Sequence, residues 1–558
     1  MTTTQEPPAR VPRRTMGLSR TADGRPVPSA RRRTVAAIGH LDRHNGWLAT
    51  LAVTALAGFL RFWRLGYPEE FLFDETYYAK DAWSLLKHGF TTSYVSGADQ
   101  KILNGRVTGI FEDSPSMIVH PEVGKWLIAL GEWAFGMDPF GWRVASALVG
   151  TLMVLVMVRL VRRLTGSLML GVTAGLLLTF DGLHFSMSRL ALLDIFMSFF
   201  LLSAVAALVA DRDWSRARMA RLVPAGWQAT PSDWGPLRGL WFRPWRLVAG
   251  LMFGLAVATK WNALFPLAAF GLLVWAWDAG ARRSFGVRRA WLRSALVDAL
   301  PAFLHLVVVA LVVYVVSWTG WLLNAAEYED SLSDTQYGSS WGSYIEEDAK
   351  GIGPEVAQSM RSLWNYHQDV YTFHTRGLLD SEHTYQSNPA GWLVLNRPVG
   401  VFADLDIKPG RDGCTAPKDS ECLRQIVLLG TPVLWWGGAV ALLYAAFAWV
   451  ARRDWRFGVA VVGALATWLP WLRYDDRPIF SFYAVATLPF TVVAITLLIG
   501  HLLGGPRASY RRRMFGTVAA GTFVVLVVVN FAWFWPVYTG DLLTTREWLQ
   551  RIWFRAWI

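Results

Sequence analysis

Repeated apolar runs of nearly membrane-spanning length restrict the fold of this chain more than any other feature. A helix needs about 20 predominantly apolar residues to cross the hydrocarbon core of a bilayer. No soluble core would need so many such runs, so we expect an all-α polytopic membrane protein with about eleven transmembrane helices. The predicted spans are about 46–63, 141–161, 167–184, 194–210, 246–259, 262–279, 299–320, 428–450, 457–472, 482–502 and 514–535.

The composition agrees with this class. Of the 558 residues, 53% are apolar and 17% are charged, whereas ordinary soluble domains carry roughly 25% charged residues. Many of the 31 tryptophans flank apolar runs, as in the aromatic belts at membrane interfaces.

The net charge of +12 raises the question of nucleic-acid binding, which the charge distribution answers. Residues 1–44 hold nine of the 54 Lys and Arg residues. Residues 65–139 instead hold 11 acidic against 5 basic side chains, and residues 320–428 hold 16 against 8. This is the positive-inside pattern of membrane proteins. It predicts a multi-pass plasma-membrane protein with a cytoplasmic N-terminus, both acidic segments and the C-terminus outside, and no nucleic-acid partner.

The same pattern divides the chain into four parts. We expect a disordered basic cytoplasmic tail over 1–44 and an N-terminal membrane module over 45–320, which includes spans one to seven and a catalytic outer loop at 65–140. An extracytoplasmic loop domain follows over 321–427, and then a C-terminal module over 428–558 with four spans and an outer tail. Trp and Arg scattered over 211–246 predict an amphipathic surface helix on the cytoplasmic side.

The two cysteines, Cys414 and Cys422, both fall in the outer loop domain. In an oxidising compartment they can close a small disulfide loop, with two free thiols as the alternative. Four ligands at zinc spacing are absent from the sequence, so a structural zinc site is not expected.

Ionisable residues collect at the outer ends of the predicted spans. A carboxylate in hydrocarbon costs several kcal/mol, so these groups must face water, a cavity or a partner. The acidic pair stands in FLFDETYYAKDA after span one, and further groups stand in VHPEVGKW, SRLALLD, KWN and WLRYDDRPIFSFY. They are Asp74, Glu75, His120, Glu122, Lys125, Arg189, Asp194, Lys260, Arg473, Asp475, Asp476 and Arg477.

This combination suits the transfer of a group from a phosphate. A carboxylate can accept a proton from an attacking hydroxyl, and fixed cations can hold the departing phosphate. Structural alternatives stay open for each residue. Asp74 and Glu75 can cap a helix, arginines at span ends commonly reach to the interface, and Tyr77 and Tyr78 can be packing residues.

The ordered set of motifs resembles the protein O-mannosyltransferases, which are multispanning glycosyltransferases of the GT-C superfamily. The series is DE in the first outer loop, HPxxGK, SRLALLD, KWN and RxxFSFY, and the resemblance covers about residues 46–540. DETYYAKDAWSL and WLPWLRYDDRPIFSFYAVATLPF are most similar to the actinobacterial branch.

The resemblance implies transfer of mannose from polyprenyl-phosphate-mannose to Ser or Thr of proteins emerging from the Sec translocon. Asp74 is then the expected general base, with Glu75 positioning the acceptor or sharing that role. The residues expected near the donor phosphate and sugar are Arg189, Lys125, Lys260, Arg477, Arg473 and His120, supported by Asp194, Tyr78 and Asp476. Membrane lipids are expected partners. No cofactor is expected, although an Asp-Glu pair can also hold a hard cation.

Two departures from the family pattern matter. Glu122 replaces the second proline of HPPxGK, and 321–427 is too short for the β-trefoil MIR domain of eukaryotic members. Three other functions stay open. A GT-C enzyme could move a lipid-linked sugar onto a lipid or glycan. A transporter or flippase would carry charges near the middle of the membrane and show repeat symmetry. A scaffold would need no acidic pair opposite phosphate-binding cations.

Overall fold

A computed structural model describes residues 40–224, 227, 233–234, 240–333, 341, 345, 351–505 and 507–558. The predicted basic tail over 1–44 therefore lies outside the described residues, except for its last five positions, which begin the first helix. Of the predicted surface segment 211–246, residues 211–222 belong to the last turns of a long helix. For residues 211–222 the prediction of a separate surface helix is wrong, because Asp211, Ser215 and Met219 are buried against neighbouring helices. The rest of the predicted helix falls largely on 225–226, 228–232 and 235–239, which lie outside the described residues.

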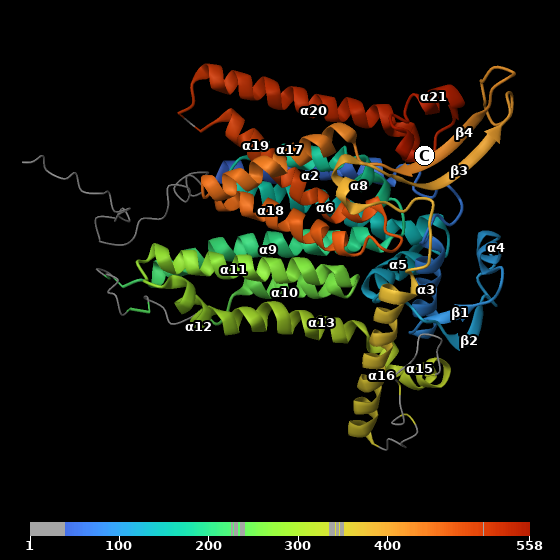
Figure 1. Ribbon diagram of the computed structural model, residues 1–558, viewed down its shortest axis with the longest axis horizontal. Helices are drawn as coiled ribbons and strands as arrows, with labels where there is room; N and C mark the ends of the chain where they lie inside the picture. The colour runs from blue at the N-terminus through green and yellow to red at the C-terminus, as the bar shows by residue number, and fades with distance from the viewer. Residues whose placement is uncertain are drawn as a thin grey trace, which may run out of the picture.

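Long apolar helices lie side by side and form a bundle (Figure 1). Each of the eleven predicted spans falls on one or two of them. The helices are α2 (His40–Phe62), α6 (Pro139–Thr165), α7 (Leu168–Thr179), α9 (Leu193–Leu222), α10 (Pro244–Val257), α11 (Leu264–Ser284), α12 (Ala290–Phe303), α13 (Val309–Ser317), α17 (Pro432–Ala451), α18 (Trp455–Trp468), α19 (Leu488–Leu503) and α20 (Tyr510–Thr539).

Seven helical segments in the described part of the chain are long and apolar enough to cross a membrane. They are α6, α9, α11 with the turn before it, α12 continued through a π turn into α13, α17, α18 with the turn after it, and α20. α7, α10 and α19 are apolar but shorter. The protein is therefore a mostly helical multi-pass membrane protein, whereas the count of about eleven spans stays a prediction.

Local signals set the helix boundaries as the sequence rules predict. The Asp138 carboxylate accepts a hydrogen bond from the Gly141 amide (2.8 Å) at the start of α6. Gly166 ends α6 with φ of 73°, a left-handed conformation that glycine adopts without steric cost. Ser167 then caps α7. This short connection sets α6 and α7 side by side in the bundle.

The first outer loop folds against one end of the bundle, at the right of Figure 1. It contains α3 (Glu75–His88), β1 (Thr92–Tyr94), α4 (Ala98–Leu103), β2 (Phe111–Pro115) and α5 (Val123–Phe135). The strands β1 and β2 form an antiparallel pair. α3 and α5 pack on each other, which places the predicted acidic pair beside the HPxxGK segment.

The loop domain lies at the same end of the bundle (Figure 1). Its helices are α14 (Thr319–Leu323), α15 (Ala325–Leu332) and α16 (Ile352–Thr372). Its strands β3 (Val399–Ile407) and β4 (Cys422–Leu428) pair with β5 (Leu543–Thr544) in an antiparallel sheet of order β3-β4-β5. The described residues of 321–427 contain no β-trefoil.

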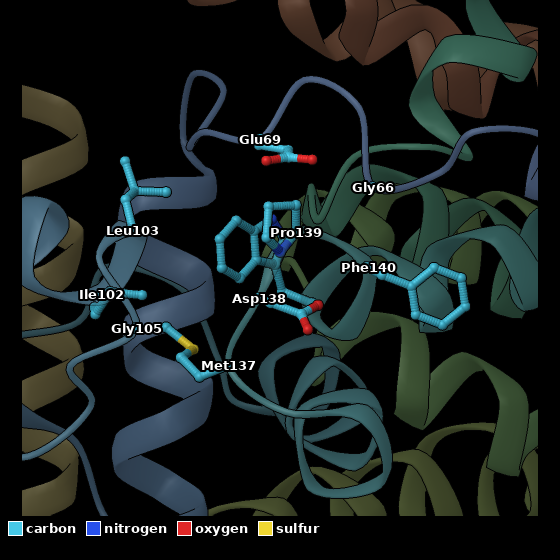
Figure 2. A pocket seen from close by; sticks show the side chains of 10 residues that line it. Gly66, Glu69, Ile102, Leu103, Gly105, Met137, Asp138, Pro139 and Phe140 are labelled. Carbon is cyan, nitrogen blue, oxygen red and sulfur yellow. The ribbon is translucent and has the colours of Figure 1, made fainter.

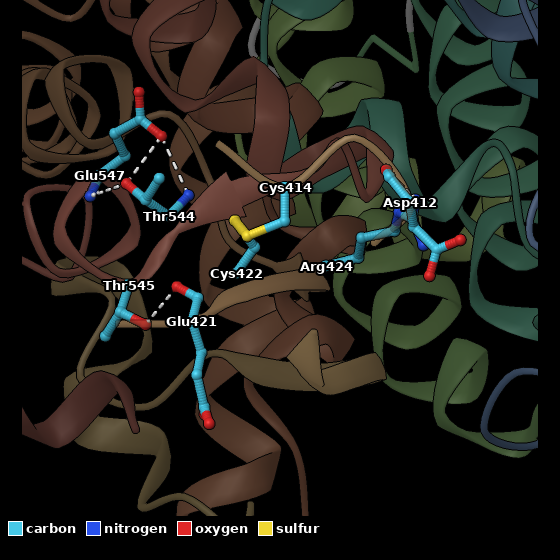
Figure 3. Close-up of a disulfide and its surroundings, with 8 residues drawn as sticks. All are labelled: Asp412, Cys414, Glu421, Cys422, Arg424, Thr544, Thr545 and Glu547. Carbon is cyan, nitrogen blue, oxygen red and sulfur yellow. Dashed lines mark hydrogen bonds between the residues drawn. A yellow bond between two sulfur atoms is a disulfide. The ribbon is translucent and has the colours of Figure 1, made fainter. Parts of the chain in front are cut away.

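The sheet joins the C-terminal segment to the loop domain (Figure 3). Cys414 and Cys422 are bonded as a disulfide beside the β3–β4 turn. Thr545 donates a hydrogen bond to the Glu421 carbonyl (2.9 Å). Thr544 and Glu547 form a capping box at the start of α21 (Thr545–Leu549).

A buried network of charges joins three helices at the other end of the bundle from the first outer loop. The Arg243 guanidinium donates to Asp211 of α9 and to Asp278 of α11 (2.9 Å from Nε and Nη1). Arg246 of α10 contacts the same two carboxylates, at 3.2 and 2.7 Å. Two arginines and two aspartates thus balance each other in a site from which water is excluded.

Candidate active site

Asp74 lies immediately before the first turn of α3 and faces a cavity at the outer-loop end of the bundle. Its Oδ2 accepts a hydrogen bond from the Tyr78 hydroxyl (3.3 Å), one helical turn further along. The preceding residue, Phe73, has φ of 54°, a conformation that is costly for a bulky side chain. Edge-to-face contacts with Phe480 (5.3 Å) and Phe482 (5.6 Å) hold Phe73 in place. The backbone is therefore held so that Asp74 faces the cavity.

Glu75 points away from this cavity and is fully buried. Its two carboxylate oxygens accept hydrogen bonds from Arg143 of α6 at 2.9 and 2.8 Å. The Ala191 amide donates to Oε1 (2.9 Å), and the Leu72 amide donates to Oε2 (3.0 Å). The geometry does not support the predicted role of Glu75 on the acceptor, because its contacts with Arg143 and the Ala191 amide join the outer loop to the bundle and its contact with Leu72 lies within the loop.

The cavity has a volume of about 1070 Å³ and is built from five separate parts of the chain. They are the first outer loop, the turn between α10 and α11, the end of α15, the segment after α16, and residues 471–483. Six of the predicted site residues line it together: Asp74, Tyr78, His120, Lys125, Lys260 and Arg477.

Two of the cavity lysines are already paired with buried carboxylates. Lys260 Nζ lies 3.0 and 2.9 Å from the oxygens of Asp194, at the start of α9. Lys125 lies 2.9 Å from Asp81 of α3. Arg477 differs from them: within the described ranges its Nε is buried without a hydrogen-bond partner, and no carboxylate pairs with its guanidinium. Arg477 therefore presents the cation whose charge is least compensated.

Burial sets the protonation of the groups around the cavity. It raises the pKa of Asp74 to about 6, although the nearby Lys260 ammonium and the Tyr78 hydrogen bond act in the opposite direction. Burial also lowers the pKa of His374 to about 4 and the pKa of His120 well below its ordinary value. The two imidazoles stack on each other with ring centres 5.3 Å apart. Both are therefore neutral at pH 7, whereas Asp74 is an ionised carboxylate of raised basicity.

Arg189, Arg473 and Asp476 do not line the cavity. The Arg189 guanidinium donates to the backbone carbonyls of Arg61 (3.0 Å) and Arg64 (3.1 Å), just where α2 ends. It borders a separate pocket of about 280 Å³. Arg473 and Asp476 are exposed at the edge of the 471–483 segment. The geometry thus gives Arg189 a structural contact and leaves the roles of Arg473 and Asp476 as predictions.

Several cavity residues were missed by the sequence interpretation. Asp81 lies seven residues after Asp74, so it shares a face of α3 with it, and this helical spacing was a usable signal. His374 comes from the end of the loop-domain helix, and no motif marks it. Glu122, which the sequence did single out as the departure from the family motif, does not line the cavity; it is buried and accepts a hydrogen bond from Trp126 Nε1 (3.3 Å). Burial raises the pKa of Glu122 to about 7.

A second pocket of about 420 Å³ lies between the 66–69 turn, the end of α4 and the start of α6 (Figure 2). Its polar side chains are Glu69 and Asp138, and no Lys or Arg lines it. Since Asp138 already caps α6, this pocket offers no contact for a phosphate. In the described part of the chain, no three His, Cys, Asp or Glu side chains converge as metal ligands.

Apolar helices of membrane-crossing length with an acid-and-cation cavity at one end define a multi-pass membrane protein, and the comparisons with known proteins show that it is a glycosyltransferase. Residues 51–327 match the family model described as dolichyl-phosphate-mannose-protein mannosyltransferase. Residues 359–557 match the C-terminal four-transmembrane region of protein O-mannosyltransferases. The chain belongs to this protein mannosyltransferase family.

Relatives match over almost the whole chain. The polyprenol-phosphate-mannose–protein mannosyltransferase of Mycobacterium tuberculosis is 37% identical over 533 residues, which is 94% of each chain. The enzyme of the same name from Corynebacterium glutamicum is 33% identical over 490 residues, or 87% of this chain and 88% of the relative. The fold is similar to that of a chain in the structure of the S. cerevisiae protein O-mannosyltransferase Pmt1-Pmt2 complex bound to the sugar donor. That comparison has a TM-score of 0.64 at 13% identity and covers 92% of this chain and 93% of the yeast chain.

Proposed function

We propose that this protein transfers mannose from polyprenyl-phosphate-mannose to Ser and Thr hydroxyls of proteins, with Asp74 as the general base. One observation carries the proposal: a buried carboxylate of raised pKa shares a cavity with fixed cations, at one end of a membrane bundle. The carboxylate suits the removal of a hydroxyl proton, and the cations suit a phosphate leaving group. The names of the curated relatives agree with this donor and acceptor.

The reaction is a single inverting displacement. The acceptor oxygen forms a bond to the anomeric carbon of mannose, on the face opposite the lipid phosphate. The bond from that carbon to the phosphate oxygen breaks, and its electron pair leaves with the phosphate. Asp74 takes the hydroxyl proton as the new bond forms. The products are mannosylated protein and polyprenyl phosphate.

Arg477 is the proposed first contact of the donor phosphate. Its guanidinium lines the cavity without a carboxylate partner in the described residues, and its planar fork suits two phosphate oxygens. Lys260 and Lys125 line the same cavity, but Asp194 and Asp81 already balance much of their charge. They therefore add to the positive field, whereas Arg477 gains a counterion when the donor binds.

Other residues in and near the cavity take supporting roles. Tyr78 orients the Asp74 carboxylate through its hydrogen bond. Glu75 and Arg189 are positioning residues, since their contacts hold the outer loop and the end of α2. The neutral His120 and His374 rings offer a flat polar surface for sugar hydroxyls.

The cavity end of the bundle is the proposed extracytoplasmic face, with the N-terminus inside and the C-terminus outside. The acidic charge of 65–139 and 320–428 supports this orientation. The acceptor is then a secreted protein that arrives unfolded from the Sec translocon, and the polyprenyl tail lies among the membrane lipids.

Transfer of radiolabelled mannose from polyprenyl-phosphate-mannose to a Ser/Thr-rich peptide tests the proposal in membranes that carry the protein. Asp74→Asn is expected to lower the rate at least about 100-fold, the usual contribution of a general base. Asp113→Asn is the matched control, because this exposed carboxylate of β2 lies outside the cavity, and its rate should stay within twofold of wild type.

Two outcomes would contradict the proposal. If Asp74→Asn transferred mannose at the wild-type rate, Asp74 would not be the general base. If label appeared in a lipid or glycan fraction and none in the peptide, the fold assignment would stand, but the acceptor would be a lipid or glycan instead of a protein.

A further inference from the structure

Helix α16 crosses the direction of the spans at the cavity end of the bundle (Figure 1). Its second half packs on the protein through buried Leu363, Tyr366 and Val370. These residues join a cluster with Trp318 and Ile118. Residues 351–357, at its beginning, are all exposed. The helix therefore extends past the bundle, approximately in the plane that a membrane surface would occupy.

A stripe of apolar side chains runs along α16, and each of its members is left exposed by the described residues, least so Met360 at 39%. Ile352, Val356, Met360 and Trp364 follow at intervals of four residues, and Tyr371 continues the stripe two turns later. The exposed fraction reaches 83% at Ile352 and 67% at Trp364. Apolar side chains at this spacing share one face of a helix, and soluble surfaces rarely leave such a stripe open.

His367 shows which way the stripe faces. It lies three residues after Trp364, four before Tyr371 and seven after Met360, so it shares their side of the helix. Its Nε2 is 2.5 Å from the Tyr314 hydroxyl near the end of α13, and its ring stacks on Trp261, before α11, at 5.5 Å. The stripe is therefore turned toward the ends of the spans and so toward the bilayer.

The stripe continues a surface that already faces lipid. Val312 and Val316 of α13, which is part of a membrane-crossing segment, are exposed along the span. Leu323 in α14, between α13 and α16, has 80% of its side chain exposed. The membrane-facing surface of the bundle and the open face of α16 thus meet at the edge of the loop domain.

We propose that α16 is an interfacial helix whose stripe, Ile352, Val356, Met360, Trp364 and Tyr371, docks on lipids of the leaflet at the cavity end. Amphipathic helices lie in this plane with the apolar face in the headgroup and acyl boundary, where Trp and Tyr are favoured. His374, just after the helix, lines the cavity. Docking of α16 therefore fixes one cavity wall at the depth where the phosphate of a lipid carrier lies.

Site-directed spin labelling tests this inference. Both native cysteines are bonded to each other, so a cysteine introduced at an exposed position is the free thiol to label. Val356→Cys and Met360→Cys report on the stripe. Arg361→Cys is the control, because the next residue of a helix is turned by about 100°. The full chain is reconstituted in phosphatidylcholine/phosphatidylglycerol vesicles and its labels are exposed to oxygen and to a nickel chelate.

Labels at 356 and 360 should collide more with lipid-soluble oxygen than with the water-soluble nickel chelate, and the label at 361 should show the reverse preference. Equal preference for nickel at all three positions would overturn the proposal. Exclusion of both reagents from 356 and 360, in vesicles and in detergent alike, would also overturn it, because protein would then cover the stripe. The readout does not depend on mannose transfer, so loss of the proposed function would not affect it.

Discussion

Asp74 and Glu75 are neighbours in sequence, yet their environments give them opposite tasks. Asp74 keeps one hydrogen bond from Tyr78 and faces the cavity. Both carboxylate oxygens of Glu75 accept hydrogen bonds from Arg143 and from two backbone amides. The difference arises because the chain enters α3 between them, so their side chains leave in different directions. Two adjacent carboxylates thus become one reactive group and one structural group.

The raised pKa of Asp74 predicts the pH dependence of the enzyme. A carboxylate acts as a base only when it is deprotonated, and burial raises its pKa from 3.8 to about 6. The value of kcat/KM should therefore be level above about pH 7 and fall about tenfold per pH unit below pH 6. Initial rates of mannose transfer between pH 5 and 8 check this expectation.

A change at Tyr78 provides the control for that profile. Tyr78→Phe removes the hydrogen bond that favours the ionised form of Asp74, so the midpoint of the profile should move to higher pH. The imidazoles of His120 and His374 stay neutral through this range, because burial lowers their pKa values. A flat profile from pH 5 to 8 would contradict the assignment of Asp74 as base.

Glu75→Gln should act on stability. The change leaves the Arg143 guanidinium buried without its counterion, which typically costs about 3–5 kcal/mol. Thermal unfolding in detergent should show a large loss of stability for Glu75→Gln and little change for Asp74→Asn. If Glu75→Gln unfolded like wild type but lost transfer, Glu75 would act directly on the substrates.

At the scale of elements, charge pairs far from the cavity hold the bundle together. Arg243 and Arg246 bind Asp211 and Asp278 between α9, α10 and α11. No substrate role follows from their position. The pairs satisfy charges that would otherwise face a dry interior, and they fix how the three helices pack.

Arg243→Ala should destabilise the protein by about 3–5 kcal/mol, because two buried carboxylates lose a shared cation. Arg163→Ala is the matched control, since the Arg163–Asp213 pair is largely exposed at 3.5 Å and should contribute less than about 1 kcal/mol. Denaturation midpoints of the two variants, measured in the same detergent, check the difference. Equal midpoints would show that the buried network is dispensable.

The helices of the bundle were predictable because long apolar runs follow directly from the thickness of a bilayer. The continuation of α9 to Leu222 was not, because its last turns carry arginines that look like a surface segment. α16 was missed because its apolar residues are widely spaced in a polar stretch. Arg143 was missed because an arginine near a span end resembles an interfacial anchor, whereas here it pairs with a buried glutamate.

At the scale of the whole molecule, the sequence identified residues of the cavity but did not predict that they lie close together in space. Asp74, Lys125, Lys260 and Arg477 were selected because they lie at span ends on one predicted side, and the structure places all four around one cavity. Arg189 met the same criterion but binds backbone carbonyls instead. Position at a span end indicates which side of the membrane a residue faces, whereas its rotation about the helix axis depends on packing.

The orientation of the molecule gives a prediction for intact cells. A thiol introduced at Glu112, exposed in the first outer loop, should react with a membrane-impermeant maleimide. A thiol at Ser284, exposed at the basic end of α11, should react only after the cells are permeabilised. Neither variant competes with a free native thiol, because both native cysteines are bonded. Reaction at Ser284→Cys in intact cells would reverse the proposed topology.

The contacts of Glu75 also indicate when the active site can assemble during synthesis of the chain. The loop that carries Asp74 leaves the ribosome early, but its anchor Arg143 follows 68 residues later, and the Ala191 amide 116 residues later. Lys260 and Arg477 follow much later still. In a growing chain, the segment that carries Asp74 therefore lacks its anchoring contacts until the start of α9 has been synthesised. The cavity lacks part of its lining until the last four apolar helices are being inserted. Mannose transfer therefore requires the chain at least as far as Arg477. A product truncated before residue 477 should insert into the membrane but should be inactive.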